Sequence, residues 1–547
     1  MRTSFFRTIL AACCLLTPAV YTTAKPYERR IAPEILEAYD MHAYGLTEQA
    51  IQRLSTYGEA HPEDGYGQLV LCMILTEAER PEEALKAGLA ADIALPKQDL
   101  EMRSANLSNI GKAQLEGNQY DEAVRSFRKA LKTDPTNSNA YNRLGWAQIS
   151  HGQYSEAKKN FMSLIRKDLN RPAGFVGLGE ICMRLNQPRK AVEMLDSVLT
   201  YDSEYGYAYN AKAHCLAMLN DSVGAADNLI LAVIHKDYDA PLLAEQDILE
   251  RWPDVLIERL KEQTDRHPLD SRYPLLLGKT CEHLGRLQEA AEYYQIGLEH
   301  KRLPALAGII ADIYVSLHQY DKALHYADVA GQLAPESNAH LALRAEILQA
   351  QGLTADAIAT LDTLIRLNAD RPDAPAYDQR AQYHMLLRQY EQALRDYNVS
   401  DSLRPETPQT IYHRGRAYLA LGDTAHAMAD MRHVVSIDTF NYVYSDAFFA
   451  YALLGEVDKG EQLIQEMLLM TKEEYMGSAH YNAACFYALT HRPDKAFEHL
   501  SEAVRAGFDD TDHMRRDPDL DELHDDPRFL PLLEAMQQKH DSPQQPQ

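Results

Sequence analysis

The sequence predicts an all-α protein, a solenoid of about thirteen helix-turn-helix units stacked one after another. Apolar residues recur with the spacing of one helix face along most of the chain, and glycines or prolines interrupt them at regular intervals. The sequence also repeats itself every 34 residues, as the segments beginning at Ser104, Ser138, Pro172 and Gly206 show. A unit of two helices cannot bury its apolar face alone, so neighbouring units must stack.

Three places in each unit carry the packing. The first helix of a unit (helix A) has a small residue in the eighth place, which lets the second helix (helix B) approach. Helix B has an alanine in the twentieth place, which lets it pack on the next helix A at about 8–10 Å, and a large apolar residue in the twenty-fourth. These places hold, in order, Gly111, Gly145, Gly179 and Ala213; Ala123, Ala157, Ala191 and Ala225; and Phe127, Phe161, Leu195 and Leu229. A break near the middle, such as Gly152 or Asn220, turns the chain between the helices.

The same register continues in both directions along the chain. Further units begin near Ile31, Gly65, Ser271, Pro304, Asn338, Ala374, Pro408 and Gly477. A weaker unit precedes the last one, with Gly455 at its turn and Gly460 in place of the alanine.

This pattern resembles the tetratricopeptide repeat family, whose units read W-x2-L-G-x2-Y, then A-x3-F, then P. Tyr141, Leu144 and Gly145 with Ala157 and Phe161 follow it, although Gln148 stands where the family has a tyrosine. The resemblance covers most of the chain. It implies a right-handed superhelix in which the A helices line a concave groove, and that peptides or partner proteins bind in this groove.

The units form two arrays with different segments around them. The stretch 240–270 has no clear small-residue pattern and Pro253 interrupts it, which predicts a degenerate helical connector. Asp517-Pro518 and Asp526-Pro527 each suit a helix start, with Asp as the cap and Pro just inside. The sequence therefore predicts an N-terminal array 31–239, the connector, a C-terminal array 271–510, capping helices 511–536 and a disordered tail 537–547.

Residues 1–24 have the layout of a secretory signal peptide. Arg2 and Arg7 precede a short apolar run, and small residues precede Lys25. This predicts export to a bacterial periplasm. Cys13 lies in a lipobox-like sequence, so a lipid anchor through Cys13 is the alternative. The run is too short to span a bilayer, and no later segment approaches a membrane span.

Charge and cysteine content exclude several classes. The formal net charge of −25 would repel a nucleic-acid backbone, and there is no basic cluster to offset it. The cysteines that follow the signal segment show no metal-ligand spacing and are interpreted as buried core residues, with a Cys182–Cys215 disulfide as an alternative. They are Cys72, Cys182, Cys215, Cys281 and Cys485.

The sequence shows no catalytic, cofactor or metal motif. Gly278-Lys279-Thr280 ends like a phosphate-binding loop, but Tyr273 stands where that loop needs glycine. The Asp517 segment starts like a calcium loop, but Glu522 and Arg528 replace its required Gly and Glu. We therefore predict no cofactor, no metal and no enzymatic activity.

The resemblance places the groove on inward-facing positions of the A helices. Asn and Arg side chains there can bind a peptide backbone and carboxylates, and Trp146 can add an apolar contact. The known clamp for C-terminal carboxylates needs Lys and Asn in three consecutive units, a set this chain does not reproduce. The candidate groove residues are Asn109, Lys112, Asn142, Arg143, Trp146, Glu180, Arg184, Asn210, His214, Lys279, Tyr412, His413, Arg416 and Asn482.

The function expected from the sequence is a non-catalytic scaffold or adaptor in the bacterial cell envelope. Its partners would be peptide segments of envelope or secreted proteins, and self-association stays open. The alternative from another class is a glycan- or cell-surface-polymer-binding protein, which would need exposed aromatic platforms; the chain has two tryptophans, Trp146 and Trp252. An enzyme with a cryptic site is the third hypothesis.

Overall fold

The computed structural model describes residues 29–235, 242–243, 245–437, 446–472 and 475–541. The signal segment and the lipobox cysteine lie outside these residues. The regular structure of the described chain is helical, and contacts divide the molecule into two compact units, residues 1–277 and 278–547. Among the described residues, no helix is both long and apolar enough to cross a membrane.

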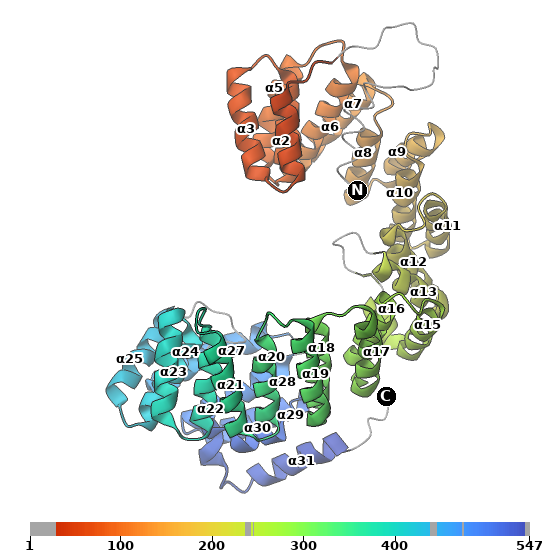
Figure 1. Ribbon diagram of the computed structural model, residues 1–547. Helices are drawn as coiled ribbons and strands as arrows, with labels where there is room; N and C mark the ends of the chain where they lie inside the picture. Colours follow the sequence, from red (N-terminus) through yellow and green to blue (C-terminus); the bar gives the residue numbers. More distant parts are fainter. Residues whose placement is uncertain (1–28, 236–241, 244, 438–445, 473–474, 542–547) are drawn as a thin grey trace. The chain divides into compact units, whose positions relative to one another are not determined.

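Unit 1 is a row of antiparallel helix pairs in which each helix contacts its neighbours (Figure 1). The even-numbered helices are the A helices of the predicted repeats and the odd-numbered ones the B helices. The helices are α2 (Pro33–Ala43), α3 (Thr47–Ala60), α4 (Gly65–Glu77), α5 (Pro81–Ala94), α6 (Leu100–Glu116), α7 (Tyr120–Thr133), α8 (Ser138–Ser150), α9 (Tyr154–Arg166), α10 (Arg171–Arg184), α11 (Pro188–Leu199), α12 (Gly206–Met218), α13 (Ser222–Ile234), α14 (Glu245–Arg251) and α15 (Pro253–Arg266).

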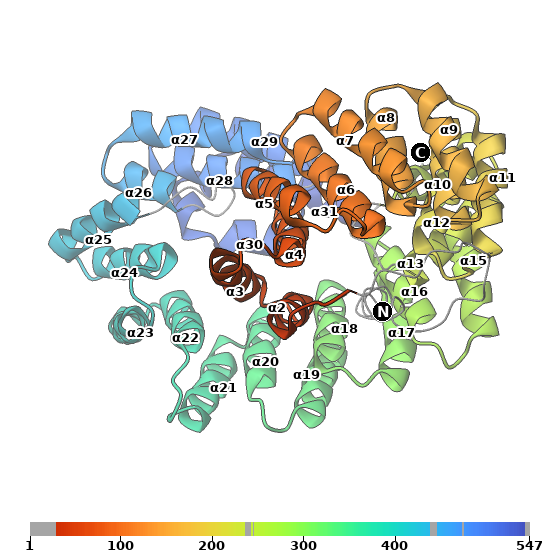
Figure 2. The same cartoon turned by 90° about the horizontal axis from the view of Figure 1, so that it is seen from above.

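The division between the units falls within α16 (Arg272–His283). Unit 2 continues the pairs, and Figure 2 shows α18 to α29 following a curve with α30 on its inner side. Its further helices are α17 (Leu287–His300), α18 (Pro304–Ser316), α19 (Tyr320–Leu333), α20 (Ala339–Ala350), α21 (Thr354–Leu367), α22 (Ala374–Leu386), α23 (Tyr390–Leu403), α24 (Pro408–Ala420), α25 (Thr424–Ile437), α26 (Ala447–Leu453), α27 (Val457–Met470), α28 (Met476–Leu489), α29 (Pro493–Arg505), α30 (Thr511–Arg516), the 3₁₀ helix η2 (Pro518–Leu523) and α31 (Phe529–Asp541).

The eighth and twenty-fourth places meet as the sequence predicts. A methyl group on Gly145 would lie 2.5 Å from the Phe161 ring, and one on Gly415 would lie 2.3 Å from Met431. The alanines in the twentieth place are fully buried. In the weak repeat, Gly460 replaces alanine because the Phe486 ring of the next A helix occupies the space that a methyl group would fill, at 2.4 Å.

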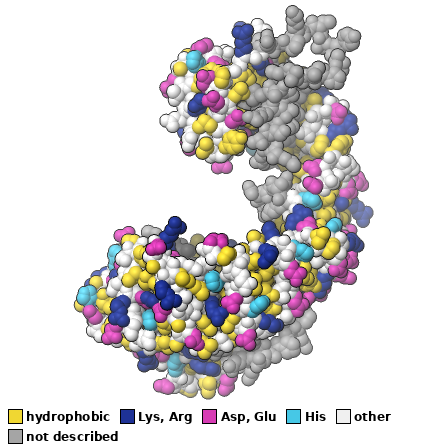
Figure 3. Space-filling view, viewed as in Figure 1, with side chains coloured by type: hydrophobic (Ala, Val, Ile, Leu, Met, Phe, Trp, Pro, Cys, Tyr) yellow, Lys and Arg dark blue, Asp and Glu magenta, His cyan; other side chains and the backbone are white. Residues whose placement is uncertain are grey.

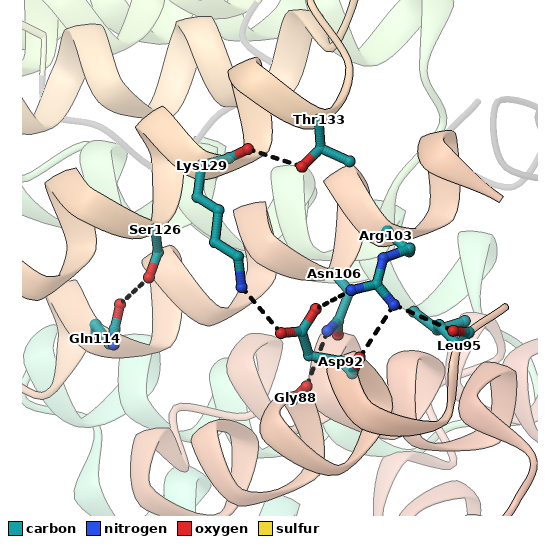
Figure 4. A network of polar contacts seen from close by, with 9 residues as sticks. All are labelled: Gly88, Asp92, Leu95, Arg103, Asn106, Gln114, Ser126, Lys129 and Thr133. Carbon is teal, nitrogen blue, oxygen red and sulfur yellow. Dashed lines mark hydrogen bonds and ion pairs between the residues drawn. The ribbon is translucent and has the colours of Figure 1, made fainter. Parts of the chain in front are cut away.

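Polar contacts between neighbouring repeats, some of them buried, add register to this apolar packing. Asn106 of α6 donates from Nδ2 to the carbonyl of Gly88 in α5, at 2.8 Å. Asp92 of α5 accepts from Arg103 of α6 and pairs with Lys129 of α7, at 3.2 and 3.1 Å (Figure 4). These bonds join one repeat to the next, so they hold the stacking angle of successive pairs.

The segments outside the regular repeats have the following structure. The predicted helical connector contains the short α14 and the regular α15, which begins at Pro253 and packs on α13. The predicted disordered tail is helical at its start, since α31 continues to Asp541; residues 542–547 lie outside the described chain. The five cysteines after the signal segment are free thiols, and all but Cys182 are fully buried, so the structure contains no Cys182–Cys215 disulfide.

Candidate partner-binding surfaces

Arg143 lies at the centre of the groove residues predicted in unit 1. Its Nη1 donates to Asn109 Oδ1 at 2.8 Å and to Ser108 Oγ at 3.2 Å, so α8 is tied to α6 through neutral groups. Burial lowers the pKa of the guanidinium from its ordinary value. Among the described residues, Arg143 has no ion-pair partner within 4 Å, although Glu77 and Glu116 act on it from a distance. This leaves a partly buried positive charge without a carboxylate beside it.

Trp146, predicted from the sequence as a groove residue, takes part in the packing of its repeat. Its ring lies edge-on to Phe161 with centroids 6.0 Å apart, and its indole nitrogen donates to Asn142 Oδ1 at 3.1 Å. The bond orients the Asn142 amide one helical turn away. The indole is half-buried, so only part of it is available to a ligand.

A second polar group lies on α10 and α12. Glu180 is 7% exposed and accepts from Arg184 Nε at 2.7 Å and from the Tyr207 hydroxyl at 3.1 Å. Arg184 itself is exposed, while Lys112 on α6 pairs with Glu116 at 3.6 Å. Glu180 is therefore already satisfied, while Arg184 and Lys112 stay at least partly exposed although each pairs with a carboxylate of its own helix.

Two of the predicted residues at the end of unit 1 have different surroundings. Asn210 is buried, and its Oδ1 accepts from the backbone N–H of Leu243 at 2.8 Å. That bond holds the chain that follows α13, which makes Asn210 a structural residue. His214, on the same helix, is partly exposed.

The predicted residues of unit 2 form one tight group and two separate positions. Tyr412 is buried and accepts from Arg416 Nη1 at 2.9 Å. Burial, together with the nearby charge of Arg416, lowers the pKa of His413 to about 4, so this ring is neutral at neutral pH and is no carboxylate-binding cation. Lys279 is exposed on α16, and Asn482 is partly exposed on α28.

Sequence reasoning missed the partner of Arg416. Arg416 Nη2 pairs with Asp519 Oδ1 of η2 at 2.6 Å, and the Tyr481 hydroxyl of α28 donates to Asp517 Oδ2 at 2.7 Å. The sequence indicates Arg416 as a groove residue and the segment around Asp517 as a cap, but it does not single out Tyr481. Nothing local to either segment says that they meet.

The surface charge supports no single polyelectrolyte partner on the side that Figure 3 shows. Basic and acidic side chains are interspersed there over both units, with apolar side chains between them.

Comparison with known proteins identifies the repeats. Three family models, each described as tetratricopeptide repeat, match residues 114–174, 257–303 and 408–441. No curated protein matches the chain.

Solved structures of low sequence identity also match. PilF of Pseudomonas aeruginosa is 18% identical, with 40% of this chain and 96% of that chain covered and a TM-score of 0.33. The C-terminal part of a repeat protein from Cytophaga hutchinsonii is 15% identical, with 48% and 94% covered and a TM-score of 0.32. The Cut9–Hcn1 hetero-tetramer of the APC/C is 14% identical, with 92% and 89% covered and a TM-score of 0.32.

The matches at 114–174 and 408–441 lie on helix pairs of the regular array, and the match at 257–303 begins on α15 of the predicted connector and continues over α16 and α17. Each pair has the small residues, the buried alanine and the large apolar residue in the same register. The chain therefore contains tetratricopeptide repeats, a fold that serves as a scaffold for protein–protein interaction.

Proposed function

We propose that the protein is a non-catalytic adaptor of the bacterial cell envelope, and that the A-helix face of unit 1 binds an extended peptide segment of a partner protein. The partner is an envelope or secreted protein that contributes a carboxylate to Arg143. The observation that carries this proposal is the charge of Arg143, which is held between neutral side chains and has no acidic residue in contact within the described part of the chain.

A carboxylate from a partner would complete this site. A guanidinium with free donors binds a carboxylate through two parallel hydrogen bonds, which gives direction as well as energy. Arg143 is already positioned by Asn109 and Ser108, so little side-chain freedom is lost on binding. Lys112 and Arg184 lie on neighbouring A helices and would extend the contact to further acidic or polar groups.

The alternative of glycan or surface-polymer binding has less support. Sugar binding favours an aromatic face that is open to the ligand. The Trp146 ring is half-buried against Phe161, and the guanidinium of Arg251 covers the Trp252 ring at 4.1 Å.

Export is part of the proposal and is tested separately. Residues 1–24 would be removed after Ala24, leaving a periplasmic protein that begins at Lys25. The measurements are the N-terminal sequence of the native protein and the cell fraction in which it is found. A chain that keeps residues 1–24 in the cytoplasm contradicts export, and a lipid on Cys13 supports the anchored alternative.

Partner binding is tested by photo-crosslinking in the native cells. A photoreactive residue at Lys112 should capture a small set of envelope proteins, whereas one at Arg125 on the exposed side of α7 should not. Arg143→Gln should then lower the affinity of the chain for the purified partner about tenfold or more. Arg125→Gln is the matched control, since it removes the same charge from an exposed B-helix position.

Each outcome assigns the site differently. Unchanged affinity in the Arg143→Gln variant would place the binding surface elsewhere. Failure to capture any protein at Lys112, with binding on a glycan or polymer array, would favour the alternative function.

A further inference from the structure

The C-terminal segment of the chain lies against the A helices of its own last repeats. η2 follows the last helix pair and packs on α28, and its Asp519 reaches back to α24, two repeats earlier. Figure 1 shows α30 and α31 running beneath α28 and α29. The segment therefore crosses from the last repeat towards the inner side of the curve instead of only closing the open end of the array.

The contacts use the groove positions of the repeats. Tyr412 and Tyr481 occupy the fifth place of their units, and Arg416 and Cys485 the ninth. Arg416 pairs with Asp519, and Tyr481 donates to Asp517, whose second oxygen caps η2 by accepting from the Asp519 backbone N–H at 2.9 Å. The two carboxylates are thus held by side chains from two different A helices.

Apolar side chains on either side of these carboxylates anchor the segment. Met514, Leu520 and Leu523 are all at most 2% exposed and belong to the same core cluster as Phe448 and Phe486. Asp519 is 12% exposed and Arg416 is 21% exposed, so their pair is largely shielded from water. The pattern is that of a peptide ligand, with two specific carboxylates between apolar anchors.

We propose that the A-helix face from α24 to α28 is a recognition site for an acidic segment with two aspartates two residues apart and a following leucine, and that residues 513–523 are its tethered resident ligand. An outside peptide of the same chemistry binds there only by displacing this segment. The resident segment and an outside peptide therefore compete for this site, and partners are excluded until the segment leaves. This inference goes beyond the proposed function and does not depend on it, because the contacts lie within one chain and within unit 2.

The test weakens the resident segment without deleting it. Asp519→Asn keeps the size of the side chain and leaves Arg416 without its carboxylate. Asp521→Asn is the matched control, since the Asp521 side chain is 68% exposed and two residues further along. The probe is a fluorescent synthetic peptide of residues 508–524 with the native sequence, added to each full-length chain.

The peptide should bind the Asp519→Asn chain about tenfold or more tightly than the wild type or the Asp521→Asn chain, because a site that is vacant more often binds more tightly. The double variant Asp519→Asn with Arg416→Gln should lose this gain, since the peptide then finds no guanidinium for its own carboxylate. Equal affinity for wild type and Asp519→Asn, or unchanged affinity in the double variant, would overturn the proposal. A segment that serves only as a structural cap would give such a result.

A second measurement keeps the proposal testable if Asp519→Asn fails to fold. A protease site inserted between the exposed Asp509 and Asp510 leaves the resident segment unchanged. After cleavage of the folded full chain, residues 510–547 are held only by non-covalent contacts. Excess labelled peptide should replace them, seen as label that co-elutes with the protein; retention of residues 510–547 with no label incorporated would contradict the proposal. Neither measurement involves Arg143 or an outside partner, so its failure is distinct from failure of the proposed function.

Discussion

Individual glycines decide how closely the helices of unit 1 approach Phe161. Gly145 of α8 and Gly177 of α10 both lie against this ring, from its own repeat and from the next one. The sequence predicts the first contact from the eighth and twenty-fourth places. The second was not predicted, because Gly177 lies outside the recurring places. Only the packed structure shows that a ring of this size needs two missing side chains.

Gly177→Ala should destabilise the protein by about 1–3 kcal/mol, because its methyl group would lie 2.3 Å from the Phe161 ring. Gly179→Ala is the control on the same helix: its methyl group would meet Leu195 at 3.4 Å, an ordinary contact, so the helix preference of alanine should leave stability equal or up to about 1 kcal/mol higher. Urea unfolding followed by circular dichroism measures both. Similar unfolding midpoints for the two variants would show that the side chains around Phe161 rearrange without a cost in stability.

The turn between helices A and B is the most regular feature at the scale of elements. Its central residue has a positive φ in most repeats, whether it is glycine, as in Gly352 (84°), or another residue, as in Arg388 (58°). The sequence predicts the turn where glycine or asparagine occupies this place. It does not predict it at Arg388, since the arginine adopts this conformation only because the helices on both sides are held by packing.

Arg388→Gly should stabilise the protein by about 0.5–1 kcal/mol, because glycine removes the strain of a positive φ although it gains entropy in the unfolded chain. The Arg388 side chain is exposed, so little contact is lost. Gly352→Ala is the reverse control and should cost about 1 kcal/mol; the new methyl group would meet no atom within 4 Å, which leaves strain as the only effect. Thermal unfolding should move in opposite directions for the two variants, and a shift in the same direction would refute the strain argument.

At the scale of the whole molecule, stability is local. Helices contact their own pair and the next pair along the chain, so the array is nearly one-dimensional. Unit 1 and unit 2 each have their own clusters of buried apolar residues. The sequence predicts this organisation, because a repeated unit packs on its neighbours and on little else.

Removal of one large core side chain should therefore loosen one unit and leave the other unchanged. Phe161→Ala should cost about 3–5 kcal/mol and Met431→Ala about 2–5 kcal/mol, since each fills the space beside a glycine. In hydrogen exchange with mass spectrometry, Phe161→Ala should accelerate exchange in α8 to α11, and Met431→Ala in α22 to α25. Faster hydrogen exchange in both units in either variant would mean that the chain unfolds as one cooperative body.

The sequence by itself determined the repeat length, the helix pairs, the small and large places that meet, and most of the residues on the A-helix face. These follow from steric requirements that recur in every unit, so they are visible as a pattern. Only the tertiary structure decided which of those residues are available. Trp146 packs on Phe161, Asn210 accepts from Leu243, and Arg416 is paired with Asp519, while Arg143 has no carboxylate beside it among the residues that the structure describes. Each of these contacts joins two particular residues and does not recur from repeat to repeat. Polar residues at the same place in different repeats therefore have different neighbours in the packed chain.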